Sequence, residues 1–280
     1  METHAYCNSV ETPPKKSDLA DLSFSLVGPG RVGQSLAAWA VACGARWVES
    51  AGKTPRAGLV SLEDFSSIGQ DFLLVAVADS ALPEVATALA RRPQARVALH
   101  TSGALAAEVL APLRVAGSQI GTLHPLKAFP HPLPDLDQAP GTFFALDGDP
   151  EAIALGRLLA ATWGGESAEV PPESRVLYHF AATLAAGGVA TLLSAAIDLG
   201  RQLGLPEAVA RGYLELARGA LEATAEAAKD GGDPARAITG PAARGDFELL
   251  TQQFRELERK APTLETLARE LAQVTRDLRD

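Results

Sequence analysis

The sequence feature that most constrains the fold is a set of three glycines directly after a short apolar run. In the stretch FSLVGPGRVGQSLAAWAVAC, the glycines at 28, 30 and 33 lie between the apolar residues 24–27 and an alanine-rich run. This order is typical of a strand that passes through a tight turn directly into a helix. A chain with 25 glycines can carry such spacing by chance, so its meaning depends on the surrounding sequence.

In a strand–turn–helix unit, each of these glycines has a physical role in holding a dinucleotide. Gly28 permits the tight turn, Gly30 lets the backbone approach a pyrophosphate, and Gly33 lets the helix pack on the strand. The amides at the helix N-terminus would face the phosphates, and Arg31 would add positive charge. The alternative is a plain strand-to-helix turn. We predict that the pyrophosphate is bound by Gly28, Pro29, Gly30, Arg31, Val32 and Gly33.

The end of the second predicted strand should carry the group that contacts the cofactor ribose. Glu49 lies about twenty residues after Gly28 and could accept from a 2′-hydroxyl, which would favour NAD. Ser50, Lys53 and Arg56 could instead hold a 2′-phosphate, which would favour NADP. Glu49 lies within the strand pattern whereas Lys53 falls in the following loop. We therefore predict NADP, with NAD as the alternative, and assign Ser50 and Lys53 to the cofactor site; Lys53 and Arg56 could equally be solvated loop charges.

Strand-like and helical patterns alternate through the first part of the chain. Segments with helical periodicity, such as 34–43, 81–91 and 150–162, separate several of the strand-like runs. This alternation predicts an α/β fold, with a Rossmann-like, doubly wound and mainly parallel sheet. The predicted strands are 24–27, 46–50, 72–77, 96–100, 118–124, 142–146 and 166–170.

The periodicity changes after the sequence VPPE at 170–173. Apolar residues then recur at helical spacing as far as residue 278, so the second part is predicted to be all helix. We interpret the apolar stretch 180–196 as a buried core helix. We find no run that is long and uncharged enough to span a bilayer. Three parts are predicted: a disordered leader at 1–21, a dinucleotide-binding Rossmann domain at 22–171 and an all-helical substrate or dimerisation domain at 172–280.

Composition argues against several classes of function. The formal net charge is -9 and no cluster of Lys and Arg occurs, which is not typical of nucleic-acid binding. The two cysteines lack the spacing of a disulfide framework or a zinc site, so we expect no metal. The leader has no apolar signal-peptide core. We expect a cytoplasmic protein that binds a small-molecule substrate, with neither a nucleic acid nor a membrane as partner.

Two predicted strand ends carry polar residues on the cofactor side. The third strand ends in VADS, and the fourth is followed by Thr101. Because doubly wound sheets bind ligands outside the carboxyl ends of their strands, these residues should lie along the cofactor. Asp79 or Ser80 could instead cap the next helix, which is the favoured reading of Asp79. The residues assigned to the cofactor are Val77, Ala78, Asp79 and Thr101.

Histidines follow two consecutive strands and recur in the helical part. His100 and Ser102 lie in HTSG at 100–103, His124 lies in HPLK at 124–127, and Tyr178 precedes His179. A histidine can give or take a proton near neutral pH, as hydride transfer to a C=O or C=N bond requires. We predict catalytic roles for His100, Ser102, His124 and His179. The alternative for each histidine is a buried structural hydrogen bond.

The string TGPAARGD at 239–246 interrupts the helical pattern with polar groups. Arg244 could hold a substrate carboxylate in a bidentate fork, and we include it among the catalytic residues. The alternative is that Arg244 pairs with Asp246 to fix a turn, with Asp246 capping the helix that follows.

Together these strings resemble a family of uncharacterised bacterial Rossmann-like proteins with an all-helical C-terminal domain of unknown function. The family is related to pyrroline-5-carboxylate reductase and to the deazaflavin-dependent NADP reductases. The resemblance covers the chain after about residue 22 and rests on GPGRVG, HTSG, HPL, YH and TGPAARGD in this order. It implies an NAD(P)-binding oxidoreductase fold whose helical domain closes the cleft and commonly pairs subunits, so a homodimer is expected. Ala186 and Gly187 depart from the Ser-Asn pair expected there.

The combined expectation is an NADP-dependent reductase or dehydrogenase of a small carboxylate-bearing oxo or imino compound. A ketopantoate-reductase-like activity would rely on a lysine in the helical part, where Lys229 and Lys260 belong to no motif. A rival from another class is a non-catalytic NAD(P)-binding sensor or interaction protein, which the Ala186-Gly187 departure favours.

Overall fold

The computed structural model describes residues 19–52, 58–65, 67, 69–92 and 94–279. The chain divides into two compact units, of which the first reaches Thr183 and the second begins at Leu184. The leader residues 1–18 and the predicted phosphate-binding residues Lys53 and Arg56 lie outside the described residues. Leu19 is described and its side chain is fully buried, so the packed part of the chain begins before residue 22.

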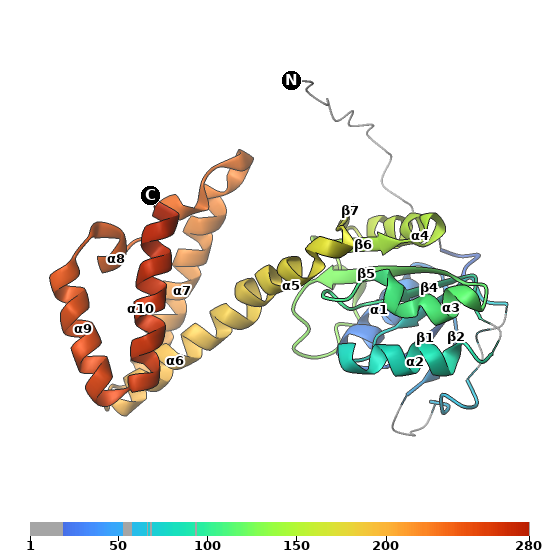
Figure 1. Cartoon of the computed structure of the whole chain (residues 1–280), viewed down its shortest axis with the longest axis horizontal. Coiled ribbons are helices and arrows are strands. Elements are labelled where there is room, and N and C mark those ends of the chain that lie inside the picture. The colour runs from blue at the N-terminus through green and yellow to red at the C-terminus, as the bar shows by residue number, and fades with distance from the viewer. Residues whose placement is uncertain (1–18, 53–57, 66, 68, 93, 280) are drawn as a thin grey trace. The chain divides into compact units, whose positions relative to one another are not determined.

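A seven-stranded sheet forms the centre of the first unit (Figure 1). The strand order is β2-β1-β3-β4-β5-β6-β7, and all neighbours are parallel except β5 and β6. This confirms the predicted doubly wound, mainly parallel sheet and each of its predicted strands. Their bounds are β1 (Ser23–Val27), β2 (Arg46–Ala51), β3 (Phe72–Val75), β4 (Val97–His100), β5 (Gln119–Leu126), β6 (Phe143–Gly148) and β7 (Glu166–Glu169).

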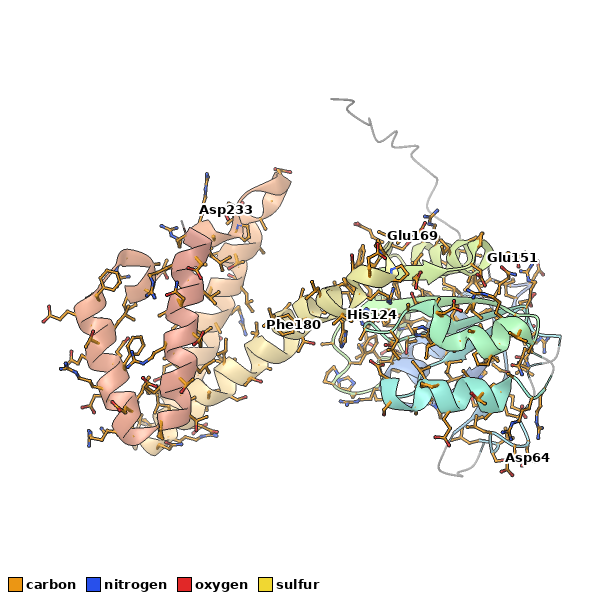
Figure 2. The ribbon with its side chains drawn as sticks, in the orientation of Figure 1. Asp64, His124, Glu151, Glu169, Phe180 and Asp233 are labelled. Atoms are coloured by element: carbon orange, nitrogen blue, oxygen red, sulfur yellow. The ribbon has the colours of Figure 1, made fainter. Side chains whose placement is uncertain are left out.

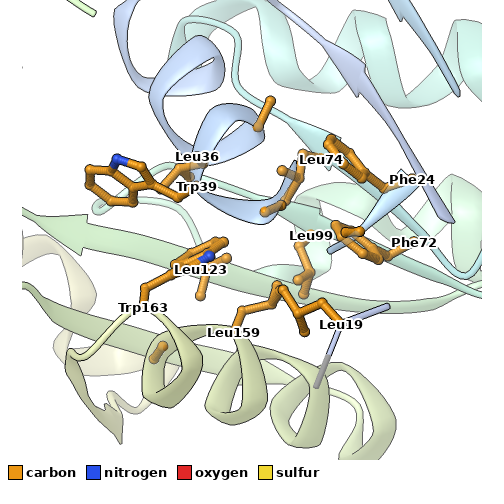
Figure 3. Close-up of a cluster of buried hydrophobic side chains, with 14 of the residues drawn as sticks. Leu19, Phe24, Leu36, Trp39, Phe72, Leu74, Leu99, Leu123, Leu159 and Trp163 are labelled. Atoms are coloured by element: carbon orange, nitrogen blue, oxygen red, sulfur yellow. The ribbon is translucent and has the colours of Figure 1, made fainter. Parts of the chain in front are cut away.

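Helices cover both faces of this sheet, so β3 and β4 are buried along their whole length and are apolar except for His100. On one face, Phe72 and Leu74 pack with Trp39 and Trp163 (Figure 3). On the other face, Leu73 packs in a second cluster with residues of α2 and α3. The helices between the strands are α1 (Arg31–Ala42), η1 (Asp79–Ala81), α2 (Leu82–Leu89), η2 (Ala107–Leu110), α3 (Ala111–Val115), η3 (Leu136–Gln138) and α4 (Pro150–Thr162).

Everything described after β7 is helical or a turn, as the change in periodicity predicts. The helical part starts at η4 (Pro172–Ser174) and α5 (Arg175–Thr183), which still belong to the first unit. In the second unit Asp246 caps α9, since its carboxylate accepts from the Leu249 amide at 3.2 Å. The helices of that unit are the π turn η5 (Leu184–Gly188), α6 (Val189–Gln202), α7 (Glu207–Ala227), η6 (Lys229–Gly231), η7 (Pro234–Ala237), α8 (Pro241–Arg244), α9 (Phe247–Lys260) and α10 (Pro262–Arg279).

Two sequence interpretations of this stretch are wrong: that no run is long and uncharged enough to span a bilayer, and that residues 180–196 form a buried core helix. The continuous helix Pro172–Gln202 is long and apolar enough to cross a membrane by length and composition, and none of its most apolar window is buried. Phe180 and Leu184 are 57% and 55% exposed, so residues 180–196 do not form a buried core helix. The sequence pattern shows that these residues are apolar, but burial depends on what covers them. α7 packs against α6, whereas Phe180 and Leu184 stay exposed.

Candidate functional site

The glycine loop between β1 and α1 has the shape that its spacing predicts. Gly28 has a φ of +89°, and a Cβ there would lie 2.5 Å from the carbonyl oxygen of Ala76. A Cβ on Gly33 would lie 2.4 Å from the carbonyl oxygen of Gly28. Both positions therefore require glycine, Gly28 for the turn and for its approach to the end of β3, and Gly33 for helix packing.

Gly30 differs from the other two glycines because a Cβ there would meet nothing within 4 Å. Its amide donates to the Gly28 carbonyl at 2.8 Å, which leaves the amides of Arg31, Val32 and Gly33 as the orphan donors of the first turn of α1. That turn contains no acidic residue, and no side chain caps the helix. Open space beside uncapped helix amides fits a bound pyrophosphate.

The strand register brings the other predicted cofactor residues to the same edge of the sheet. Val27 pairs with Val75, Val75 with His100, and His100 with Thr122. The segments that follow β1, β3 and β4 therefore leave the sheet side by side. The strand order also switches here, because β2 lies on one side of β1 and β3 on the other. Such a switch point is where doubly wound sheets bind ligands. The segments contain the predicted residues Val77, Ala78, Asp79 and Thr101.

The contacts of several predicted cofactor residues differ from those that the sequence suggested. Ala81 precedes α2 and no side chain caps that helix, so neither Asp79 nor Ser80 makes the capping bond considered for them. The Arg31 guanidinium donates to the Pro130 carbonyl at 3.2 Å. Ser50 is buried in β2 and its hydroxyl accepts from the Trp47 indole at 3.0 Å. The NADP assignment of Ser50 and Lys53 stays a prediction.

His100 is held by the backbone on both sides of its ring. Its Nε2 donates to the Ala106 carbonyl at 3.1 Å, and its Nδ1 accepts from the Ser102 amide at 3.2 Å. The ring is fully buried, and burial is the main reason why its pKa falls to about 4. The Ser102 hydroxyl in turn accepts from the Leu105 amide at 3.1 Å. His100 and Ser102 thus shape the HTSG turn. For His100 this is the buried structural hydrogen bond that was the alternative to a catalytic role.

His124 lies on β5 near α5 (Figure 2). Its Nδ1 makes a hydrogen bond, and its Nε2 faces the HTSG turn. The Tyr178 hydroxyl lies 2.9 Å from Nδ1 of His124. A Cβ at Gly103 would lie 2.7 Å from Nε2 of His124 and 2.5 Å from Nδ1 of His179. The rings of His124 and His179 meet edge to face, with centroids 5.7 Å apart. The structure therefore brings two of the predicted histidines together around Gly103.

His124 is held neutral, as is His100. The pKa of His124 is lowered to about 4, mainly by burial and to a smaller extent by His179, Arg175 and His100. At neutral pH His124 is consequently an uncharged imidazole, which can donate through one nitrogen and accept through the other.

Arg175 and Tyr178 were not assigned roles from the sequence. Arg175 begins α5, is fully buried, and donates from Nη2 to the Ser102 carbonyl at 3.1 Å. Tyr178 and His179 follow it by three and four residues, so all three side chains share one face of the helix. That spacing of polar residues within the otherwise apolar segment RVLYHFAA is the signal that could have identified them.

Arg244 belongs to the second unit, where it ends α8 and is exposed. Its side chain makes no ion pair or hydrogen bond with Asp246 among the described residues, whereas Asp246 caps α9. The pairing alternative is therefore wrong and the capping alternative is confirmed.

A glycine loop that fits a pyrophosphate, at the switch point of a doubly wound sheet, defines a protein of the Rossmann class. Residues 10–125 match the Rossmann-like domain, and residues 142–275 match a domain of unknown function, DUF2520. The chain carries a Rossmann-like domain followed by a DUF2520 domain, as the resemblance in sequence implies. A comparison with curated proteins finds no match.

Solved structures share this fold along nearly the whole chain. A candidate NADP oxidoreductase from Bacteroides fragilis is 20% identical with a TM-score of 0.76, over 93% of this chain and 100% of its own. A protein from Thermotoga maritima is 20% identical with a TM-score of 0.66, over 91% and 98%. The pyrroline carboxylate reductase of Plasmodium falciparum, solved with NADP bound, is 15% identical with a TM-score of 0.58, over 94% and 100%.

Proposed function

We propose that the protein is an NADP-dependent oxidoreductase acting on a small carboxylate-bearing oxo or imino compound. The observation that carries the proposal is the position of His124. Its Nε2 borders Gly103, in the turn that follows β4 at the sheet edge where the glycine loop also lies. A proton-handling ring at the same sheet edge as a dinucleotide loop is what reduction of a C=O or C=N bond requires.

The amides of Arg31, Val32 and Gly33 would hold the cofactor pyrophosphate. When bound, the nicotinamide would supply or accept a hydride at the substrate carbon. NADP is supported by Lys53 in the sequence and by the NADP in the Plasmodium falciparum reductase, which has the same fold. His124 would hold the proton for the substrate oxygen or nitrogen. The assignment of Arg244 to a substrate carboxylate stays a prediction from the sequence.

The proposal is tested first by cofactor binding. We expect NADPH to change its fluorescence on titration with the protein, and to bind more tightly than NADH. A panel of 2-oxo acids and cyclic imines is then screened for loss of NADPH absorbance. Failure of both nucleotides to bind would exclude every dinucleotide function. Tighter binding of NADH than of NADPH would overturn the assignment of Ser50 and Lys53 to a 2′-phosphate.

A second candidate function is a non-catalytic NAD(P)-binding sensor. The observation that favours it is the π turn η5, whose sequence LAAGG contains no polar side chain where the resemblance predicts a Ser-Asn pair. Binding of NADPH without turnover of any compound in the panel would support the sensor and contradict the enzyme.

We further propose that the second unit pairs two copies of the chain. None of the 21 residues of α7 is buried, and Leu214 and Leu221, which lie seven residues apart on one face of this helix, are 45% and 54% exposed. Because a stable helix in water normally buries an apolar face, this exposure favours a partner surface. A second copy presents the same leucines and can bury them in an isologous contact.

The pairing predicts that the protein is a dimer in light scattering at micromolar concentration. Leu221→Glu should produce monomers, because an interface would have to bury an unpaired charge. Arg211→Glu, at an exposed polar position on the same helix, is the matched control and should remain dimeric. A monomeric wild-type protein would contradict the pairing.

A further inference from the structure

The first observation is a buried positive charge without a carboxylate partner. Arg175 is fully buried, and among the described residues only its Nη2 has a hydrogen-bond acceptor, the Ser102 carbonyl. Nε and Nη1 are buried and make no hydrogen bond within the described chain, and no carboxylate of the described residues forms an ion pair with the guanidinium. An unpaired buried charge is costly. Its retention needs a reason other than stability.

The second observation is the group one helical turn away. The Tyr178 hydroxyl lies 2.9 Å from Nδ1 of His124, and the two rings meet edge to face with centroids 5.6 Å apart. Burial raises the pKa of Tyr178, while the charge of Arg175 lowers it. The guanidinium therefore favours a negative charge on the Tyr178 oxygen, which the buried surroundings otherwise oppose.

Few titratable or charged groups surround Tyr178 and His124. They are Arg175 and His179 on α5, His100 on β4, and Asp147 on β6, which attracts Arg175. A carboxylate oxygen of Asp147 accepts from the Ala107 amide at 2.8 Å, so it is oriented toward the backbone of η2. Arg175 is the cation that acts on Tyr178.

We propose that Tyr178, His124 and Arg175 form a proton relay for the reaction assigned under Proposed function, on which this inference rests. The Nε2–H bond of His124 breaks as a new O–H or N–H bond forms on the substrate. The O–H bond of Tyr178 breaks as a new N–H bond forms at Nδ1 of His124. The proton thus moves by two transfers, and His124 stays uncharged. The starting state returns when Nε2 of His124 takes a proton from water and the Nδ1 proton moves back to the phenolate oxygen of Tyr178.

The relay accounts for three features together. An imidazole held neutral cannot store the proton as an imidazolium, so it needs a donor at its far nitrogen, which Tyr178 provides. The transient phenolate needs a nearby positive charge, which Arg175 provides. A carboxylate paired with Arg175 would neutralise that charge, which explains why the guanidinium has none. In this scheme His124 is the catalytic residue, and Arg175 is a positioning residue that acts through Tyr178.

The wild-type protein provides the first test, without substrate. Nitrogen-15 NMR of the histidine rings distinguishes a protonated from an unprotonated ring nitrogen. We expect His124 to carry its proton on Nε2 and to accept from Tyr178 at Nδ1 at pH 7. A His124 ring protonated at Nδ1, donating to the Tyr178 oxygen, would overturn the relay. His124→Asn assigns the signals.

The charge of Arg175 is tested by titrating Tyr178. The phenolate absorbance of Tyr178 is obtained as the difference between each protein and the same protein carrying Tyr178→Phe. In Arg175→Met the pKa of Tyr178 should rise by about one unit, as expected for loss of a nearby opposite charge. Arg175→Lys should restore most of the shift. An unchanged Tyr178 titration in folded Arg175→Met would contradict the electrostatic role.

Kinetics provide the third readout once the screen gives a substrate. Tyr178→Phe should lower kcat by about a hundredfold, with KM and the NADPH dissociation constant nearly unchanged, because only the proton source is lost. Unchanged kcat would overturn the relay. Failure of NADPH to bind the wild-type protein would instead contradict the proposed function, while the NMR and absorbance results would still decide whether Tyr178 and His124 are coupled.

Discussion

Replacement of Gly30 by glutamate is expected to abolish NADPH binding while the protein stays folded. The Cβ of residue 30 would project into open space, so the backbone accepts a side chain there without a clash. The same open space lies beside the amides of Arg31, Val32 and Gly33, where the pyrophosphate is proposed to bind. A carboxylate at this position would repel the phosphates and compete for the same amides.

Fluorescence titration with NADPH measures the effect, and circular dichroism checks the fold. Gly212→Glu adds the same charge at a glycine of α7 whose Cβ would also meet nothing within 4 Å, and it should bind NADPH like the wild-type protein. Gly30→Ala should weaken binding much less than glutamate, because a methyl group carries no charge. Wild-type affinity in Gly30→Glu would show that the nucleotide does not use this loop.

Replacement of His124 by asparagine is expected to lower turnover by a factor on the order of 10² to 10⁴, the usual contribution of a general acid or base. Asparagine keeps a polar side chain near Gly103 but has no group that can exchange a proton at neutral pH. NADPH binding should be nearly unchanged, since the glycine loop is separate from this ring. The measurement is kcat with the best compound from the screen of oxo acids and imines.

Two other histidines separate chemistry from structure. His131 is exposed, and its one hydrogen bond to the described residues is with the neighbouring Pro132 carbonyl, so His131→Asn should have wild-type activity. His100→Asn should destabilise the fold by about 1–3 kcal/mol, because it disrupts buried hydrogen bonds to the Ala106 carbonyl and the Ser102 amide. Full turnover in His124→Asn would exclude this ring as the proton donor.

The sequence predicted the sheet well because its signals are local. Apolar β-rich runs separated by helical segments identify strands such as 72–75 without any knowledge of their neighbours, and the order of the glycines identifies the turn after β1. The residues that follow parallel strands also meet at one edge by topology alone. Strand signals and sheet topology were therefore enough to predict that Thr101 and the glycine loop lie at the same edge of the sheet.

The division of roles among the polar residues could not be predicted from the sequence. His100 and His124 both follow strands, and only the structure shows that the backbone occupies both nitrogens of the first ring while one nitrogen of the second meets a tyrosine. Arg175 resembles any arginine at the start of a helix until its burial is known. The exposure of Phe180 likewise depends on what covers the helix, which its composition does not reveal.

Gly103 limits how this site can change during evolution. Any side chain at this position would collide with Nδ1 of His179 and with Nε2 of His124. A mutation at residue 103 can therefore be tolerated only after at least one of the rings has become smaller or moved away. The glycine and the two histidines form a set whose members are expected to be kept or lost together, so a homologue with alanine at this position should also differ at a histidine.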